Sequence, residues 1–173
     1  MRVAFSGVQC TGKTTLLNEL EKLNLNYKVI KFVVRDLVKT KNIKVNQEGN
    51  EDTQIQIANQ HLKNLENDNV FVDRCLLDCM AYTTWMYNKG QINEVTFNLV
   101  KEKYKNNINK YNVIFYMRPE FELKDDGFRS LDIKFRDEVL EIFEDLVKDL
   151  KNVKVLTGSV QERIDNVLKV IGD

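Results

Sequence analysis

The chain has 173 residues, 43% of them hydrophobic, which suits one compact domain, residues 1–173, with a single core. Its 26 basic and 26 acidic residues cancel, so the composition disfavours DNA and anionic lipid as partners and favours a small molecule, although a local basic groove is compatible with it. No apolar run reaches the roughly 18 residues of a membrane span, and a strand predicted from residue 2 leaves no room for a signal peptide, so we expect a cytoplasmic protein.

The first predicted strand, residues 2–6, leads directly into the motif G-x-x-x-x-G-K-[ST], and an apolar helical segment follows. This motif binds phosphate only between a strand and a helix, where backbone N–H groups and the helix N-terminus converge on one anion. Both flanks are present here. The predicted nucleotide-binding residues are Gly7, Val8, Gln9, Cys10, Thr11, Gly12, Lys13, Thr14 and Thr15.

Each residue type in this loop suits a triphosphate. Gly7 and Gly12 let the backbone approach phosphate oxygens without a Cβ in the way. Lys13 supplies a cation for the β- and γ-phosphates, and the Thr14 hydroxyl is an oxygen ligand of the kind that Mg²⁺ prefers. The loop therefore predicts a nucleoside triphosphate and Mg²⁺ as ligands.

Short β-branched runs alternate with longer amphipathic segments along the chain, which is typical of a parallel sheet covered by helices. We expect five strands, at residues 2–6, 27–33, 70–73, 113–117 and 153–156. Asn93 is expected to cap one helix, and Ser159 with Glu162 forms a capping box for the last one. The stripes expected to face the core are Ile55, Ala58, Leu62 and Leu65; Phe97, Val100, Tyr104 and Ile108; Phe135, Val139, Ile142, Phe143, Leu146 and Leu150; and Ile164, Val167, Leu168 and Ile171.

In such a sheet the ligand lies beyond the carboxyl ends of the strands, so residues that follow a strand are candidates by position. The third strand ends in Asp73, where a P-loop protein places the carboxylate that holds Mg²⁺ or its water. Arg74 follows where a motor ATPase commonly has a second acid, and a cation there suits a phosphoryl acceptor or the charge on the transferred group. A helix cap beside a solvated arginine is the alternative for this pair.

The three cysteines predict a reduced protein rather than a metal or disulfide framework. Cys10 lies in the loop, and Cys75 and Cys79 are four residues apart. A zinc site would need His61 and a carboxylate to join them, so thiols that face the core are the simpler interpretation.

Four segments together resemble the P-loop nucleoside and nucleotide kinases: residues 7–15, residues 73–82, residues 126–130 with Arg136, and residues 157–159. The resemblance is closest to the group that includes the nicotinamide riboside kinase domain and related phage-type kinases. It implies an α/β, three-layer P-loop NTPase fold, with a five-stranded parallel sheet flanked by helices and a small mobile lid at about residues 120–136.

The resemblance also implies roles for individual residues. Asp78 and Tyr82 would line the acceptor pocket on the helix after Asp73. Arg129 and Arg136 would close over the phosphates from the lid, which supplies charge to a loose phosphoryl-transfer transition state once water is excluded. Three further residues complete the implied set: Gln54, which would read a base edge unless it is a solvated helix position, and Gly158 and Ser159, which would pack against the adenine of ATP.

The general base is the one position where the sequence departs from the related kinases. These carry a carboxylate just after the second strand, a few residues before an arginine. Here that position is apolar, and the nearest acid, Asp36, lies on the far side of Arg35. Three alternatives stay open: Asp36 is the base, Asp73 is the base, or the acceptor is already a phosphate and needs no strong base at neutral pH.

The expected function is an ATP- and Mg-dependent phosphotransferase that moves the γ-phosphoryl group to a nucleoside or nucleoside monophosphate of deoxynucleotide type. The alternatives are a kinase of a hydroxymethylated base in DNA, and a P-loop ATPase or non-catalytic nucleotide-binding protein. A homodimer is compatible with the sequence. The expected catalytic residues are Lys13, Asp36, Asp73, Arg74, Arg129 and Arg136, the substrate-binding residues are Arg35, Gln54, Arg74, Asp78 and Tyr82, and the metal ligands are Thr14 and Asp73.

Overall fold

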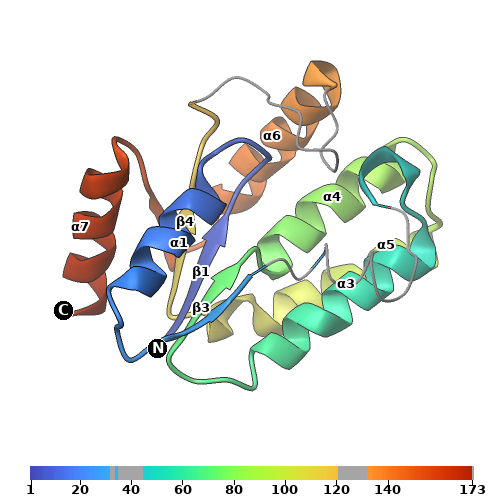
Figure 1. Ribbon diagram of the computed structural model, residues 1–173. Helices are drawn as coiled ribbons and strands as arrows, with labels where there is room; N and C mark the ends of the chain where they lie inside the picture. Colours follow the sequence, from blue (N-terminus) through green and yellow to red (C-terminus); the bar gives the residue numbers. More distant parts are fainter. Residues whose placement is uncertain (32–33, 35–44, 121–131, 173) are drawn as a thin grey trace.

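The computed structural model describes residues 1–31, 34, 45–120 and 132–172 (Figure 1). Its centre is one five-stranded sheet in the order β2-β3-β1-β4-β5, in which all neighbouring strands are parallel. The strands are β1 (Arg2–Ser6), β2 (Lys28–Ile30), β3 (Val70–Asp73), β4 (Val113–Tyr116) and β5 (Val153–Val155). The chain extends from β1 to β2 and β3 on one side and to β4 and β5 on the other, so the sheet reverses its order at the carboxyl end of β1.

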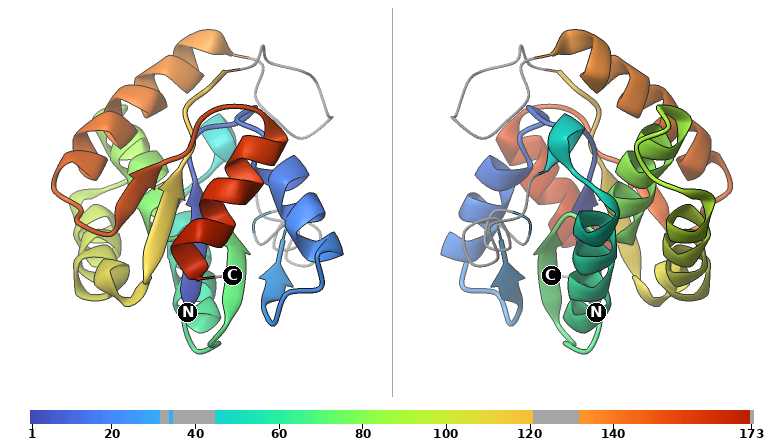
Figure 2. Two further views of the ribbon diagram at one scale, coloured as in Figure 1. Left: turned by 90° about the vertical axis from the view of Figure 1, so that its left-hand side faces the viewer. Right: turned by 90° about the vertical axis from the view of Figure 1, so that its right-hand side faces the viewer.

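Helices cover both faces of the sheet, and the three-layer α/β prediction is confirmed (Figures 1 and 2). One face carries α1 (Lys13–Lys22) and α7 (Val160–Ile171), and the other carries α3 (Glu51–Asn64), α4 (Leu76–Asn88), α5 (Glu94–Asn107) and α6 (Ile133–Lys148). Short 3₁₀ turns lie at Asn46–Glu48 and Ile108–Lys110. Among the described helices, none has the length and apolar character needed to traverse a bilayer.

Successive side chains of each strand point to opposite faces of the sheet, so the hydrophobic core has two parts, one on each face. Val3 and Phe5 of β1 face α1 and α7, whereas Ala4 faces the opposite helical layer. The Phe5 ring lies 5.8 Å from that of Phe71 and 5.5 Å from that of Phe115, so aromatic contacts join three neighbouring strands. Burial on both faces explains why these strands are continuous apolar runs.

The structure corrects some bounds and one helix face. β4 and β5 each end one residue earlier than expected. β2 begins one residue later than expected and pairs with β3 over three residue pairs at the edge of the sheet, and residues 32–33, at the expected end of this strand, lie outside the described residues. The expected stripe on α3 is rotated: Ile55 and Leu62 are only half-buried. The buried side of this helix is largely polar and comprises Thr53, Gln54, Ile57, Ala58, His61 and Asn64.

Two helix starts follow the sequence prediction. The Asn93 side chain accepts a hydrogen bond from the Thr96 N–H at 2.8 Å and caps α5. Ser159 and Glu162 form the expected capping box at the start of α7. The sequence alone was sufficient to predict these two helix caps, because in each one the side chain and the backbone group that it bonds lie three residues apart.

Candidate functional site

The phosphate loop, residues 7–14, lies at the carboxyl end of β1, at the point where the sheet reverses its order. Its backbone takes positive φ at Gly7 (134°), Cys10 (58°) and Gly12 (85°). A Cβ on Gly7 would lie 2.3 Å from the Met117 carbonyl oxygen, so no other residue fits there without displacing backbone. Gly12 is the N-cap of α1, and the loop therefore delivers the start of this helix to the site.

The Lys13 ammonium is enclosed by the loop itself. Its Nζ donates to the Gly7 carbonyl at 2.7 Å, the Val8 carbonyl at 2.6 Å and the Thr11 hydroxyl at 2.8 Å. The residue is 6% exposed. These oxygens compensate the cost of burying the cation in the protein without a nucleotide.

Asp78 holds the first glycine of the loop from the N-terminal turn of α4. One carboxylate oxygen accepts from the Gly7 N–H at 3.2 Å and from Arg74 Nη1 at 2.9 Å, and the other accepts from the Cys75 N–H at 2.9 Å. The residue is 2% exposed, so these charge-assisted bonds are shielded from water. Asp78 thus joins the helix start, the arginine and the loop.

Arg74 sits in a strained left-handed conformation at the end of β3, with φ of 68°. Its Nη1 also donates to the Gly7 carbonyl at 3.3 Å, and the guanidinium lies 5.5 Å from the centre of the Tyr82 ring. Burial alone would lower the pKa of Arg74, but Tyr82, Asp78 and Asp73 together raise it above its ordinary value. The Tyr82 hydroxyl donates to the Gln9 side chain at 3.1 Å, so α4 contacts the loop a second time.

Asp73 and Thr14 are the two expected metal ligands, and each has a side-chain oxygen donor. Asp73 is the last residue of β3, pairs in register with Phe5 of β1 and is 8% exposed. Thr14 lies in the first turn of α1 and is half-buried. The described residues contain no cluster of three or more His, Cys, Asp or Glu side chains that could hold a metal. This donor set fits Mg²⁺, which takes few protein ligands and completes its shell with phosphate oxygens and water.

Two expected site segments lie at helix starts. Gly158 has φ of 95°, and Ser159 caps α7; both are exposed. Arg136 lies in the first turn of α6 and pairs with Asp137 at 3.1 Å. Arg35, Asp36 and Arg129 lie outside the described residues, as does most of the expected lid at 120–136.

Gln54 is buried rather than solvated, which rules out the simple surface position considered for it. It is 3% exposed, accepts a hydrogen bond from the Thr83 hydroxyl at 2.9 Å and donates to Met86 Sδ at 3.0 Å. His61, two helical turns further along the same face of α3, is 1% exposed. Burial lowers its pKa to about 4, with Asp78 raising it and Arg74 lowering it by smaller amounts.

Arg163 of α7 is a site residue that the sequence analysis missed. It is 2% exposed, and its Nη1 donates to the Thr11 carbonyl of the loop at 2.8 Å. The sequence does contain a feature that indicates its burial: Arg163 lies four residues before the buried Val167, on the apolar stripe of an amphipathic helix. A cation at such a position requires buried partners.

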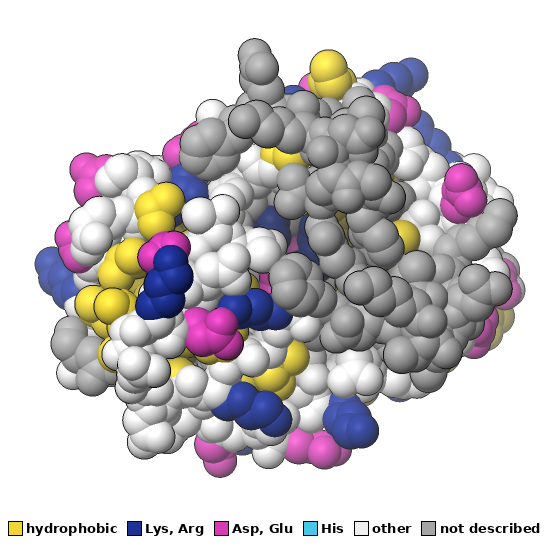
Figure 3. All heavy atoms as spheres, viewed as in Figure 1, with side chains coloured by type: hydrophobic (Ala, Val, Ile, Leu, Met, Phe, Trp, Pro, Cys, Tyr) yellow, Lys and Arg dark blue, Asp and Glu magenta, His cyan; other side chains and the backbone are white. Residues whose placement is uncertain are grey.

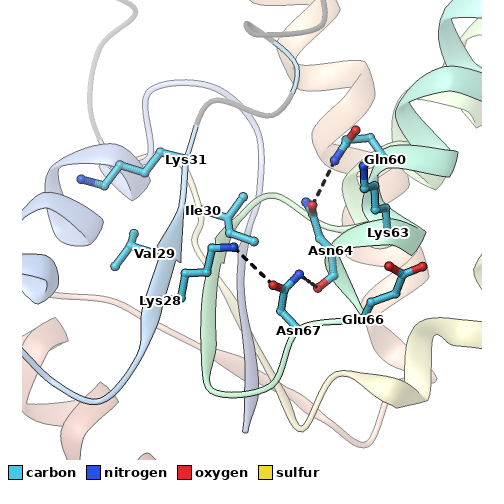
Figure 4. Close-up of a pocket in the computed structure, with 9 residues that line it drawn as sticks. All are labelled: Lys28, Val29, Ile30, Lys31, Gln60, Lys63, Asn64, Glu66 and Asn67. Carbon is cyan, nitrogen blue, oxygen red and sulfur yellow. Dashed lines mark hydrogen bonds between the residues drawn. The ribbon is translucent and has the colours of Figure 1, made fainter.

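A groove of about 670 Å³ lies along the edge of the sheet, between β2 and α3, and its lining residues are separate from the phosphate loop (Figure 4). Lys28 donates to Asn67 and Gln60 donates to Asn64 within it. Lys31 points away toward α1, where it bonds Asn18 at 2.8 Å. Over the face seen in Figure 3, charged side chains of both signs are interspersed among the described residues, in keeping with the zero net charge.

The fold and the loop define a P-loop nucleotide-binding domain of the doubly wound α/β type. The chain matches the family described as "AAA domain" over residues 2–163, and it belongs to that family. No curated protein matches the chain in sequence.

Several solved structures share the fold over nearly the whole chain. The NadR protein in complex with NR is 20% identical with a TM-score of 0.76; the match covers 99% of this chain and 51% of NadR, so the chain spans about half the length of that protein. Deoxyadenosine kinase from M. mycoides is 17% identical with a TM-score of 0.67, covering 99% of this chain and 98% of the kinase. Thymidylate kinase from Candida albicans is 11% identical with a TM-score of 0.66, covering 98% and 90%. At these identities the likeness establishes the fold.

Proposed function

We propose that the protein transfers the γ-phosphoryl group of ATP to a nucleoside or a nucleoside monophosphate. The observation that carries this proposal is the buried Lys13 ammonium inside a loop that is braced by Asp78 and Arg74. Several kinases with this fold, among them deoxyadenosine kinase and thymidylate kinase, act on such small acceptors according to their names. The loop and the adjacent cation are the parts that phosphoryl transfer requires.

On the donor side, backbone N–H groups of the loop and the N-terminus of α1 bind the phosphates. Lys13 lies at the loop centre and exchanges contacts with loop oxygens for contacts with the β- and γ-phosphates, which keeps its charge next to the group that is transferred. Gly158 and Ser159, exposed at the start of α7, form the surface for the adenine. Arg136, with Arg129, supplies further positive charge to the phosphates.

Thr14 and Asp73 would hold Mg²⁺, which neutralises charge on the β- and γ-phosphates when it is bound. Arg74, not a second acid, follows Asp73, and this arrangement favours an acceptor other than water. Because Arg74 is fixed by Asp78 and by the Tyr82 ring, its guanidinium has one preferred position from which to orient an acceptor.

On the acceptor side we assign Arg35, Gln54, Arg74, Asp78 and Tyr82 to binding. Asp36 and Asp73 remain the two candidates for the general base, and an acceptor that is itself a phosphate would need neither. Asp78 contributes to acceptor binding indirectly, by holding Arg74 and the loop, because both of its oxygens are already engaged.

The test is transfer of labelled phosphate from ATP, with Mg²⁺, to nucleosides, nucleoside monophosphates and hydroxymethylated DNA. We expect negligible ATP turnover until a nucleoside or nucleotide is added, and a labelled small-molecule product afterwards. A labelled DNA product would instead identify a kinase of a modified base.

An ATPase is the second candidate, and membership of the "AAA domain" family favours it. Rapid ATP hydrolysis with water alone, unaffected by any acceptor, would support that function against ours. Tight ATP binding with no turnover under any condition would indicate a nucleotide-binding protein without catalysis.

A further inference from the structure

Arg163 bridges the phosphate loop and the segment that follows β4. Its Nη1 donates to the Thr11 carbonyl at 2.8 Å, and its Nη2 lies 2.6 Å from a Glu120 carboxylate oxygen. The side chain is 2% exposed, whereas that of Glu120 is 33% exposed. Three parts of the chain that are distant in sequence therefore meet at one guanidinium: α7, the phosphate loop and the segment just after β4.

A buried guanidinium is costly, so its position needs a physical reason. Removing a charge from water is compensated only by good hydrogen bonds and an opposite charge, and here a carbonyl and a carboxylate provide them. Arginine matches both at once, because its planar fork presents separate N–H groups in fixed directions. A hydrophobic residue at this position on the α7 stripe would have packed without that cost, which indicates that the contacts themselves matter.

The Thr11 carbonyl controls the direction of a loop N–H group. The peptide bond between Thr11 and Gly12 is trans, so the Gly12 N–H points opposite to the Thr11 C=O. With the carbonyl bonded to Arg163, that N–H is directed away from α7. A rotation of this peptide plane would instead direct a carbonyl oxygen at the phosphate, which repels it.

Thr11 is also linked to the Lys13 ammonium. The Thr11 hydroxyl accepts from Lys13 Nζ at 2.8 Å while the Thr11 carbonyl accepts from Arg163. Arg163 therefore fixes the backbone of the residue that holds one of the Lys13 contacts. Asp78 fixes the loop at Gly7, and Arg163 fixes it at Thr11, from opposite layers of the fold.

We propose that Arg163 is a positioning residue for the phosphate loop, paired with Glu120, that sets the orientation of the Thr11-Gly12 peptide for nucleotide binding. This inference rests on the proposed function only in that the loop binds Mg·ATP. Arg163 is not among the residues assigned to the acceptor, so its substitution should change the affinity for ATP and not the affinity for the acceptor.

The test compares Arg163→Met with a chemically matched control, Arg2→Met. Arg2 also bonds one carbonyl and one carboxylate, those of Asn67 at 3.2 Å and Asp68 at 2.8 Å, but at the opposite end of β1. We expect Arg163→Met to weaken Mg·ATP binding in calorimetry about tenfold, or about 1.4 kcal/mol, and to raise KM for ATP equally without changing KM for the acceptor. Arg2→Met should leave the ATP affinity unchanged.

Two further variants keep the test decisive if Arg163→Met does not fold. Arg163→Lys retains the charge but not the fork, so it should restore part of the ATP affinity, and Glu120→Gln should weaken binding less than Arg163→Met does. Wild-type ATP affinity in Arg163→Lys and Arg163→Met, or an equal loss in Arg2→Met, would overturn the inference. So would a wild-type protein that does not bind Mg·ATP, whereas ATP binding without transfer to any acceptor would contradict only the proposed function.

Discussion

The two sides of the candidate site are built in different ways. The phosphate side is a continuous stretch of backbone, residues 7–14, whose shape depends on glycine and whose lysine bonds the loop itself. The proposed acceptor side consists of side chains from α3, α4 and the residue that follows β3, which bond one another: Arg74 with Asp78, and Gln54 with Thr83. The first side is one contiguous segment whose backbone is braced from outside by Asp78 and Arg163, and the second is assembled entirely from side chains of separate elements.

This difference explains where specificity can vary. A backbone loop offers N–H groups that recognise phosphate regardless of the rest of the nucleotide. Side chains such as Gln54 and Tyr82 are held by their neighbours, so a change in one of those neighbours can redirect them. We therefore expect variants on the phosphate side to affect every reaction of the protein and variants on the acceptor side to affect the choice of acceptor.

The largest effect is expected on the phosphate side, from Lys13→Met. The variant removes the cation and three loop contacts, so transfer should fall on the order of 10²- to 10³-fold for every acceptor. Steady-state kinetics measure this. Lys22→Met is the matched control, because Lys22 lies on the same helix, is exposed and pairs only with Glu19 in the described structure. Similar activity in the two variants would contradict the role of Lys13.

Asp78→Asn tests the residue that bonds both the phosphate loop, at Gly7, and Arg74. It removes the charge partner of Arg74 and one acceptor for a backbone N–H, so the free energy of unfolding should fall by about 3 kcal/mol. KM should rise for both ATP and the acceptor. Chemical denaturation and kinetics on Asp145→Asn, which removes an exposed ion pair with Lys148, provide the comparison. A variant as stable as wild type would show that Asp78 does not brace the loop.

Gln54→Leu should change binding of the acceptor and leave binding of ATP unchanged. If Gln54 reads the acceptor, KM for the acceptor rises several-fold while KM for ATP stays constant. Thr83→Val removes the hydroxyl that holds the Gln54 amide and should shift acceptor preference in a panel of nucleosides. If both variants lose only about 1 kcal/mol of stability, with unchanged acceptor kinetics, Gln54 is a core residue.

His61 should affect the pH dependence of stability. Its pKa is about 4 in the folded protein and 6.5 in an unfolded chain, so the unfolded state binds more protons between these values. The free energy of unfolding should therefore fall as the pH drops, by roughly 2 kcal/mol at pH 5 relative to pH 7 from this residue. Denaturation of His61→Gln over the same pH range should lack this component. Parallel curves for the two proteins would show that His61 is not buried in neutral form.

The sequence predicted the parts of the fold that depend on local patterns. Apolar runs indicated all five strands, and the caps at Asn93 and Ser159 were identified because each bonds a residue three positions away. The phosphate loop was recognisable because its function requires particular residues in a contiguous order. The start of β2 was placed one residue too early, because pairing at an edge strand depends on its neighbour as well as on its own residues.

The parts that could not be predicted involve partners far apart in the chain. Arg163 bonds a residue 152 positions away, and Asp78 bonds Gly7 71 positions away. The buried face of α3 was misjudged because Gln54 and Thr53 satisfy their polar groups internally, which no count of apolar residues indicates. A buried polar group is predictable only together with its partner.

Calorimetric titration of the purified protein with Mg·ATP, alongside Lys13→Met, tests the central claim most directly. We expect saturable binding of Mg·ATP by the wild type, and markedly weaker binding by the variant at the same folded fraction. A wild-type protein that does not respond to millimolar Mg·ATP, or a variant that binds as tightly as wild type, would contradict it.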